Sequence, residues 1–397
     1  MNTPFDVAVI GAGVSGLSFA HYAAAAGLRC LVLEQAARAG GSIRTARTED
    51  GFWLELGAHT LYNSYGSLLD IIVAAQLGDA VISRHKAPYR LLVDGKVRSV
   101  PSQLALGELF ASAWRAFTER RTGRTVADYY GRMVGKRNWR RVFSPLLSAV
   151  PSQRADDFPA EMLFKRRPRR KDFPRTFTLA QGISTLVDRL LETRGVELRC
   201  EADVDKIERT PEGFTLALAG GSAFRARHVA LAISPPVAAR LLAHVAPAAA
   251  EALARIRTTA IDSTGVVVAR DRVSFPRIAG LVPLDDVFLS AVSRDVVPDD
   301  RWRGFAFHFC KGQSRDQRLD RIAAVLGANR AEFAQVFECS SSLPSPELGH
   351  GEIVQAIDRG IAGSGIFVTG NYFGGLALED CVLRSKSEAA RLERRTV

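Results

Sequence analysis

A strand–helix–strand unit is predicted at the start of the chain. Residues 6–10 form a short apolar run typical of a buried strand, and the alanine-rich stretch 14–26 predicts a helix that Gly27 ends. Residues 29–33 predict a second strand. Two strands joined by one helix make a βαβ unit, the elementary piece of a parallel sheet.

Further pieces of the same α/β layer are predicted by apolar runs bounded by turn residues. They are a strand and hairpin at 196–207 and 214–218, a buried strand at 229–233 closed by Pro235-Pro236, a strand at 365–369 that runs into the glycine-rich stretch 370–375, and a helix at 381–392. Because these pieces are far apart in the sequence, the layer must be assembled from separate segments.

Two segments of different character lie between these pieces. One is rich in Arg, Trp, Phe and Tyr, and the other holds strand-like runs at 265–269 and 305–309 and a predicted helix at 315–326. We therefore expect an α/β fold in which a discontinuous Rossmann-like nucleotide-binding domain carries an inserted mixed α+β substrate-binding domain. The expected boundaries are 1–83, 177–244 and 347–397 for the first domain, and 84–176 and 245–346 for the second.

Size and charge narrow the class of protein. The 397 residues, 47% of them hydrophobic and 24% charged, suit about two globular domains with a large core. The formal net charge of +11 indicates an anionic partner, such as a phosphate-bearing cofactor, a carboxylate-rich substrate or an anionic membrane. Nucleic acid is not expected, because the chain has neither an RNA-binding motif nor zinc-finger spacing.

Cysteine usage and the apolar start bear on the compartment. The chain has five cysteines, namely Cys30, Cys200, Cys310, Cys339 and Cys381. Because they are odd in number, scattered and without a CxxC pair, we expect neither a disulfide framework nor a metal site. Glycines and His21 interrupt the apolar stretch 7–33, and the start has no basic segment, so we predict no membrane span and no signal peptide. The expected location is the cytoplasm.

The sequence Gly11-Ala12-Gly13-Val14-Ser15-Gly16 joins the first predicted strand to the helix. Gly11 permits a tight turn, Gly13 lets the backbone approach a pyrophosphate, and Gly16 lets helix and strand pack closely. The N-terminus of the helix offers N–H donors to the phosphates. Glu34 ends the second strand, about twenty residues downstream, where it can bind a ribose. The motif therefore predicts dinucleotide binding.

A second glycine patch, Arg38-Ala39-Gly40-Gly41-Ser42-Ile43-Arg44-Thr45, favours FAD over a nicotinamide cofactor. Its glycines let the chain pass close to a bulky ligand, and Arg38 and Arg44 can neutralise phosphate charge. The strand-like run that follows ends in Gly57-Ala58, which suits a backbone pressed against a flat ring. A nicotinamide enzyme needs no such patch, so we expect FAD as the cofactor.

With these motifs the sequence resembles the flavin amine oxidase superfamily, and within it the protoporphyrinogen and coproporphyrinogen oxidases. The likeness rests on both glycine motifs, on Glu55-Leu56-Gly57-Ala58 and on the segment 89–101. It rests also on the C-terminal stretch, where Leu343-Pro344 and Gly349-His350 precede the run 370–381.

The resemblance implies which residues hold the flavin. Val204 contacts the adenine end through its backbone, and Asn371 with residues 376–378 faces the pyrimidine ring at the start of a helix whose dipole favours a reduced flavin. The expected cofactor-binding residues are Gly11, Ala12, Gly13, Val14, Ser15, Gly16, Glu34, Gln35, Arg38, Gly41, Ser42, Arg44, Gly57, Ala58, His59, Thr60, Val204, Gly370, Asn371, Leu376, Ala377 and Leu378. His59 is also the catalytic-site candidate: it either contacts the substrate or tunes the ring, or it is a positioned spectator.

The resemblance also implies an activity. Such enzymes oxidise a reduced, carboxylate-bearing tetrapyrrole by hydride transfer from a methylene bridge to the flavin, which oxygen or another acceptor then reoxidises. The basic chain suits this anionic tetrapyrrole. Two alternatives stay open, namely an amine oxidase or desaturase of the same fold, and a non-catalytic flavin-binding or porphyrin-carrier protein. The oligomeric state also stays open.

Three features have two interpretations each. The basic run 165–171 either attracts anionic groups, including lipid, or is a solvated loop. The apolar stripe of the helix predicted at 104–117 faces the core by default, and alternatively makes a lid or touches the inner face of a membrane as a peripheral contact. Tyr372 and Phe373 either line the ring and cage an amine, or belong to the core.

Overall fold

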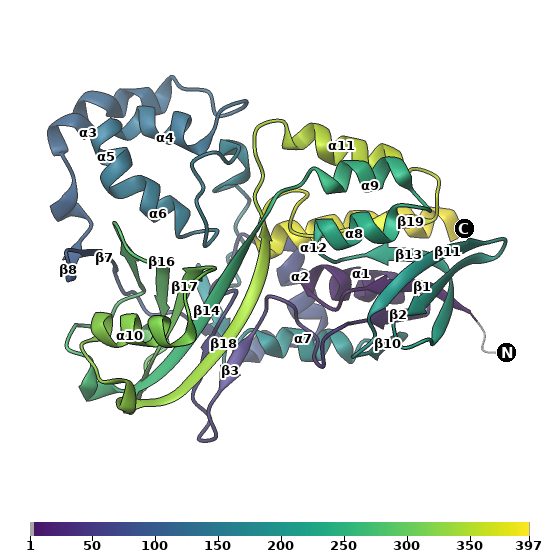
Figure 1. Ribbon diagram of the computed structural model, residues 1–397, viewed down its shortest axis with the longest axis horizontal. Helices are drawn as coiled ribbons and strands as arrows, with labels where there is room; N and C mark the ends of the chain where they lie inside the picture. Colours follow the sequence, from purple (N-terminus) through teal and green to yellow (C-terminus); the bar gives the residue numbers. More distant parts are fainter. Residues whose placement is uncertain (1–3, 397) are drawn as a thin grey trace.

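The structure is a computed structural model that describes residues 4–396, and Figure 1 shows its elements. Two seven-stranded sheets organise the chain. One is parallel in its centre and is covered by helices on both faces, and the other is largely antiparallel and carries a helical lobe at one end (Figure 1). The fold is thus mixed α/β, as predicted.

The first sheet has the strand order β10-β2-β1-β13-β12-β11, and β19 also pairs with β13. The contacts of β1 with β2 and β13, of β2 with β10 and of β13 with β19 are parallel, whereas β11, β12 and β13 run antiparallel to one another. The strands are β1 (Phe5–Ile10), β2 (Cys30–Leu33), β10 (Val196–Arg199), β11 (Val204–Thr210), β12 (Gly213–Leu218), β13 (Ala223–Leu231) and β19 (Ile366–Val368). The predicted βαβ unit is confirmed, with helix α1 at Val14–Ala25.

One prediction for this sheet is wrong in detail. The run 196–207 is two strands, β10 and the first half of β11, which lie at opposite ends of the sheet. Apolar periodicity shows that both pieces are strands, but the break between them follows from pairing with different partners. Pro235-Pro236 does more than close β13, because it also opens the next helix.

Helices cover both faces of the first sheet. Val7, Val9 and Val32 point to the face packed by α1, α2 (Gly66–Ala74), α7 (Ser184–Leu191) and α12 (Leu378–Thr396). Their neighbours Ala8 and Leu33 point to the face packed by α8 (Pro235–Leu242), α9 (Pro247–Ala254) and α11 (His350–Gly360). Because both faces are buried, the central strands are apolar at every position.

The second sheet has the order β18-β14-β17-β16-β15-β7-β8. Phe305, Phe307 and Phe309 on one face of β17 pack with helix α10, whose predicted bounds, Arg315–Leu326, are confirmed. The strands are β7 (Tyr89–Val93), β8 (Lys96–Ser99), β14 (Thr258–Ala269), β15 (Gly280–Pro283), β16 (Phe288–Ser293), β17 (Trp302–Cys310) and β18 (Phe333–Pro344).

Short elements join the two sheets. Leu54 and Leu56 pack against Val267 and Ala306 of the second sheet, so the hairpin that follows the second glycine patch reaches between the layers. The strands of this hairpin are β3 (Thr45–Arg47) and β4 (Trp53–Glu55). The other short elements of the chain are β5 (Leu61–Tyr62), η1 (Gly78–Ala80), β6 (Val81–Ser83), β9 (Thr176–Leu179), η6 (Arg270–Arg272), η7 (Arg294–Val296) and η8 (Arg330–Glu332). The domain boundaries themselves stay a prediction.

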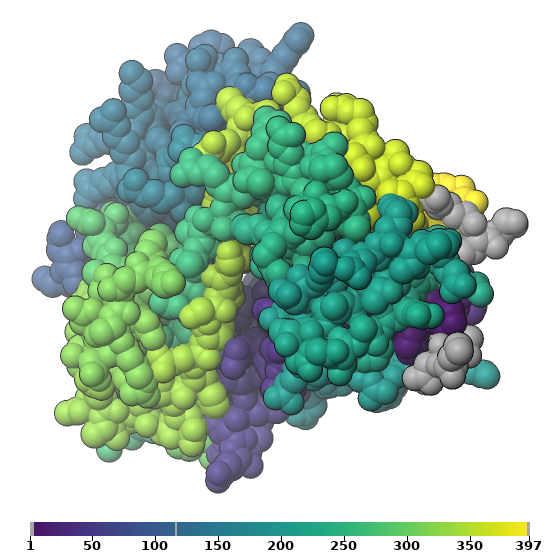
Figure 2. Space-filling view, turned by 45° about the vertical axis from the view of Figure 1, so that its right-hand side comes forward, coloured from purple at the N-terminus to yellow at the C-terminus, as the bar shows by residue number. Residues whose placement is uncertain are grey.

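A helical lobe made from residues 101–163 stands above one end of the second sheet, blue in Figures 1 and 2. It is built from η2 (Pro101–Gln103), α3 (Leu106–Ala113), η3 (Trp114–Phe117), α4 (Val126–Val134), α5 (Lys136–Asn138), the π-helical turn η4 (Trp139–Phe143), α6 (Ser144–Ser148) and η5 (Ala160–Met162). None of the helices within residues 4–396 has the length and apolar character needed to cross a membrane.

The core-facing interpretation of the 104–117 helix is wrong. Its apolar stripe faces solvent, with Leu106 at 54%, Phe110 at 77%, Trp114 at 57% and Phe117 at 93% exposure. Helical spacing of apolar residues shows that a helix has an apolar face, but only tertiary packing decides whether anything covers it. The lid and interfacial interpretations stay predictions.

Candidate functional site

The predicted nucleotide site lies where parallel strands of the first sheet end together. Gly11 N–H bonds to the Leu33 carbonyl of β2 at 2.8 Å, and Ala232 N–H bonds to the Ile10 carbonyl of β1 at 2.8 Å. The chain therefore leaves β1, β2 and β13 at one edge of the sheet. The carboxyl edge of such a sheet is where open α/β folds bind ligands.

The glycines of the first motif have different tasks. Gly11 has φ +98°, and a Cβ there would lie 2.6 Å from the Ala232 carbonyl oxygen; a Cβ on Gly16 would lie 1.9 Å from the Gly11 oxygen. Gly13 is extended, with φ −75° and ψ 177°, and its Cβ would meet nothing nearer than the Gly41 Cα at 4.0 Å. The fold requires Gly11 and Gly16, whereas Gly13 leaves room for a ligand.

The three predicted glycine segments meet in space. Gly40 N–H bonds to the Ala12 carbonyl at 2.8 Å, and a Cβ on Gly41 would lie 3.1 Å from the Gly13 Cα. The third segment joins the second through Ala58 N–H, which bonds to the Ser42 carbonyl at 3.3 Å. The three segments therefore lie backbone against backbone, and their predicted close approach to a ligand stays a prediction.

The three glycine segments form what we call the glycine floor of the predicted site, and the polar groups around it suit a diphosphate. Helix α1 has no side-chain cap and no acidic residue in its first turn, so its first N–H donors remain for an anion. Glu34 accepts from Ala12 N–H at 2.8 Å and Ala36 N–H at 3.0 Å, and Gln35 beside it is exposed. Burial, then the nearby Arg44, lowers the pKa of Arg38.

The C-terminal segment closes on the same place. Helix α12 begins at Leu378, as predicted for the pyrimidine-facing run, and its Ser385 hydroxyl donates to the Ser15 carbonyl at 2.8 Å. Glu379 accepts from the N–H groups of Ser67 and Leu68 at 2.9 Å each. The first half of α12 is therefore anchored against the N-terminal turns of α1 and α2. Val204 is buried at the start of β11, and its adenine contact stays a prediction.

Two aromatic residues do not lie at the ring. Tyr372 is 1% and Phe373 8% exposed, and both belong to the core beneath α9 and α11. The Arg384 guanidinium lies 3.8 Å from the centre of the Phe373 ring. The interpretation that these residues line the flavin or cage an amine is wrong, because their run folds back into the first sheet's core instead of toward the substrate side.

Part of the basic run 165–171 forms ion pairs with acids of other helices. Lys165 and Arg167 form ion pairs with the buried Asp380 of α12 at 3.1 and 2.6 Å, and Arg170 pairs with Asp70 at 3.1 Å. Lys165 and Arg167 thus tie the segment after the helical lobe to α12, and Arg170 ties it to α2. Sequence reasoning missed this pairing, because nothing in a run of like charges identifies a partner 213 residues away.

His59 is held in a chain of three polar side chains. Its Nε2 lies 3.0 Å from Nε2 of His308, whose Nδ1 lies 2.9 Å from the Ser263 hydroxyl. Burial, with His308 and Arg84 nearby, holds the pKa of His59 well below its usual range, and burial lowers the pKa of His308 to about 4. One ring therefore donates and the other accepts while both are neutral. The catalytic role of His59 stays a prediction.

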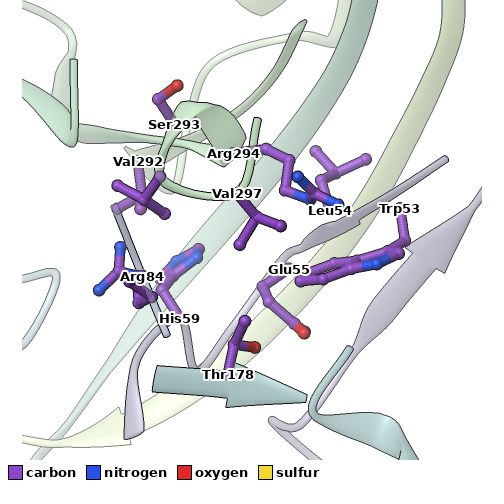
Figure 3. Close-up of a pocket in the computed structure, with 11 residues that line it drawn as sticks. Trp53, Leu54, Glu55, His59, Arg84, Thr178, Val292, Ser293, Arg294 and Val297 are labelled. Atoms are coloured by element: carbon purple, nitrogen blue, oxygen red, sulfur yellow. The ribbon is translucent and has the colours of Figure 1, made fainter. Parts of the chain in front are cut away.

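A cavity opens beside His59, between β4, β9 and η7 (Figure 3). Figure 3 shows Arg84 next to His59 on one side and Arg294 over Trp53 on the other. The remaining lining residues are Leu54, Glu55, Thr178, Val292, Ser293, Val296 and Val297. Sequence analysis did not single out Arg84, Arg294 or His308, because they belong to no motif. The one available signal was a histidine between the phenylalanines of β17.

Comparison with known proteins places these observations in context. Residues 14–270 match the family model described as flavin-containing amine oxidoreductase. A 15-cis-phytoene desaturase of Arabidopsis thaliana is 37% identical over 76 residues, which is 19% of this chain and 13% of the desaturase. The chloroplastic protoporphyrinogen oxidase 1 of Arabidopsis thaliana is 21% identical over 463 residues, covering 95% of this chain and 86% of that protein.

Solved structures share the whole fold. A provisionally named protoporphyrinogen oxidase from Exiguobacterium sp. 255-15 superposes with a TM-score of 0.83 at 19% identity, covering 100% of both chains. The cyclohexylamine oxidase of Brevibacterium oxydans IH-35A superposes with a TM-score of 0.76 at 16% identity, covering 99% of this chain and 100% of the other. At these identities the likeness establishes the fold alone.

Proposed function

The chain belongs to the flavin-containing amine oxidoreductases, enzymes whose cofactor is FAD, and on that premise we propose that it oxidises a porphyrinogen, protoporphyrinogen IX or coproporphyrinogen III. Bound FAD supplies a two-electron acceptor for hydride. The protein's own contribution is to bind the diphosphate on the glycine floor, to position the tetrapyrrole and to exclude water. Oxygen or another acceptor completes the cycle.

The distribution of charge carries this proposal. Residues 104–175 contain 17 Lys and Arg against 7 Asp and Glu, an excess of 10 when the whole chain has a net charge of +11. The rest of the molecule is nearly neutral, so the formal positive charge is concentrated in the helical lobe and in the basic run that follows it. The field of this charge concentrates an anionic substrate and repels a cationic amine. The near full-length match to a named protoporphyrinogen oxidase supports the same substrate class.

We propose that the same lobe contacts an anionic membrane surface. The exposed stripe of Leu106, Phe110, Trp114 and Phe117 supplies apolar groups, and the basic residues of the lobe supply attraction to acidic headgroups. A peripheral contact of this kind suits an apolar tetrapyrrole ring with acidic substituents, which partitions to the same interface.

Anaerobic reduction of the flavin tests the reaction. FAD-loaded protein is mixed with protoporphyrinogen IX, coproporphyrinogen III, cyclohexylamine and putrescine in separate cuvettes. Bleaching of the yellow flavin by a porphyrinogen, with fluorescent porphyrin appearing in proportion, is the expected result. Bleaching by an amine alone would establish the amine oxidase alternative and overturn the proposal. Bleaching by none of them would favour a desaturase substrate or a non-catalytic carrier.

A further inference from the structure

The cavity beside His59 is lined by two buried arginines, and some of their nitrogen atoms have no hydrogen-bond acceptor. Within the described residues, Nε of Arg84 and both Nε and Nη1 of Arg294 are buried without a hydrogen-bond acceptor. The hydroxyl of Thr178, on the same wall, is buried and unpartnered as well. A buried donor without an acceptor costs about 1–3 kcal/mol, and more for a charged group, so four such atoms around one cavity need an explanation.

The acids of the neighbourhood do not supply the missing acceptors. Asp295 is bonded to Arg303 at 2.5 Å, and Asp299 accepts from backbone N–H groups at 2.9 Å. Glu55, which lines the cavity, accepts from Ile183 N–H at 2.7 Å and from the Thr45 hydroxyl. Burial raises the pKa of Glu55 to about 7, so this acid neutralises the arginines only in part.

We propose that this cavity binds a carboxylate group, with Arg84 and Arg294 as its cationic walls. A guanidinium presents N–H donors in a planar fork that matches carboxylate geometry, and a buried, uncompensated guanidinium gains most from such a partner. The Arg84 side is anchored, because one of its nitrogens donates to the Thr60 hydroxyl. The Arg294 side is anchored by the Trp53 ring, whose centre lies 4.2 Å from the guanidinium carbon.

The size of the cavity limits what enters it. Its internal volume is only about 20 Å³, which suits one small polar group such as a carboxylate head and excludes a tetrapyrrole ring. The carboxylate has two sources: a side chain of the substrate, or a small free carboxylate. Only the first source rests on the proposed function, since carboxylate binding itself does not require turnover.

Acetate binding to FAD-loaded protein tests the inference directly. Isothermal titration with sodium acetate, at constant ionic strength and with sodium chloride as the non-carboxylate control, is expected to show saturable binding that chloride does not reproduce. Arg84→Met and Arg294→Met are each expected to weaken acetate binding about tenfold or more, because a charge-assisted hydrogen bond is lost. Arg194→Met is the matched control, since Arg194 is exposed and does not line the cavity.

The outcomes separate cleanly. Equal acetate affinity in wild type and both cavity variants, or acetate no better than chloride, overturns the inference. If a methionine variant fails to fold, Arg294→Lys keeps the charge but loses the fork, and weaker acetate binding is still expected. Displacement of acetate by coproporphyrin III identifies the substrate as the source of the carboxylate, and simultaneous binding of both identifies a small free carboxylate. Acetate binding without porphyrinogen turnover leaves the cavity site standing and removes only the proposed function.

Discussion

Replacing Gly13 by alanine tests whether this glycine is needed for FAD binding and not for folding. The Cβ of Gly13→Ala would lie 4.0 Å from its nearest neighbour, and the backbone there is extended, so the protein accommodates the methyl group without strain. The same change at Gly16 would place Cβ 1.9 Å from the Gly11 oxygen, inside the contact distance. Only the ligand's approach over the loop gives Gly13 a reason to be glycine.

The two variants have opposite expected signatures. Gly13→Ala should leave the free energy of unfolding of the apoprotein within about 1 kcal/mol of wild type, or raise it slightly, since alanine restricts the unfolded chain. Its affinity for FAD should fall about 10- to 100-fold, corresponding to one lost hydrogen bond to a charged group of about 1.5–3 kcal/mol. Gly16→Ala should lower stability by about 3 kcal/mol or more, as overpacking against backbone does.

Urea unfolding of the apoproteins and quenching of flavin fluorescence on titration measure both quantities. Gly107→Ala is the control, because a Cβ there meets no atom within 4 Å. Wild-type FAD affinity in Gly13→Ala, with the apoprotein stable, would refute the placement of the diphosphate on this loop. Loss of folding in Gly13→Ala would refute the conclusion that the protein accommodates a methyl group at this position.

Three further predictions follow from particular contacts. Asp380→Ala should lower the free energy of unfolding in urea by about 1–3 kcal/mol, because the buried Asp380 carboxylate is the acid that pairs with both Arg167 and Lys165. The triple change of Phe110, Trp114 and Phe117 to serine should leave stability nearly unchanged but abolish sedimentation with vesicles of anionic lipid. His308 has a folded-state pKa of about 4, below its unfolded value of about 6.5, so its neutral form favours the native state; stability should fall by up to about 3 kcal/mol from pH 6.5 to pH 4, and His308→Asn should flatten that slope.

Each of these has a matched control. For Asp380 the control is Asp300→Ala, which removes an acid whose side chain is 98% exposed. For the apolar stripe it is Leu348→Ser, which changes an exposed apolar residue outside the lobe, and for His308 it is His244→Asn, which changes an exposed histidine. Each control should behave like wild type. If the Asp380 variant is as stable as Asp300→Ala, the ion pairs of Asp380 do not stabilise the fold. If vesicle binding survives the triple change, the stripe does not contact the membrane. If His308→Asn leaves the pH dependence of stability unchanged, the buried neutral His308 does not cause it.

The sequence by itself determined the strand–turn–helix unit at the start of the chain. The turn at Gly11, the close packing at Gly16 and the acid at Glu34 are demands of a local strand–turn–helix geometry, so residues within about thirty positions of each other specify them. The bounds of α1 and α10 followed likewise from local periodicity and caps. The family resemblance added the prediction that segments from both ends of the chain bind the same cofactor. Local sequence patterns give no such information.

Tertiary structure alone decided what surrounds that site. The stripe on α3 and η3 predicted an amphipathic helix, but its exposure depends on whether another element covers it, and none within the described residues does. The burial of Tyr372, the pairing of Asp380 with the basic run, and the meeting of Arg84, Arg294 and His308 join residues up to hundreds of positions apart. Such contacts cost chain entropy that only the complete core offsets, so no local pattern in the sequence encodes them.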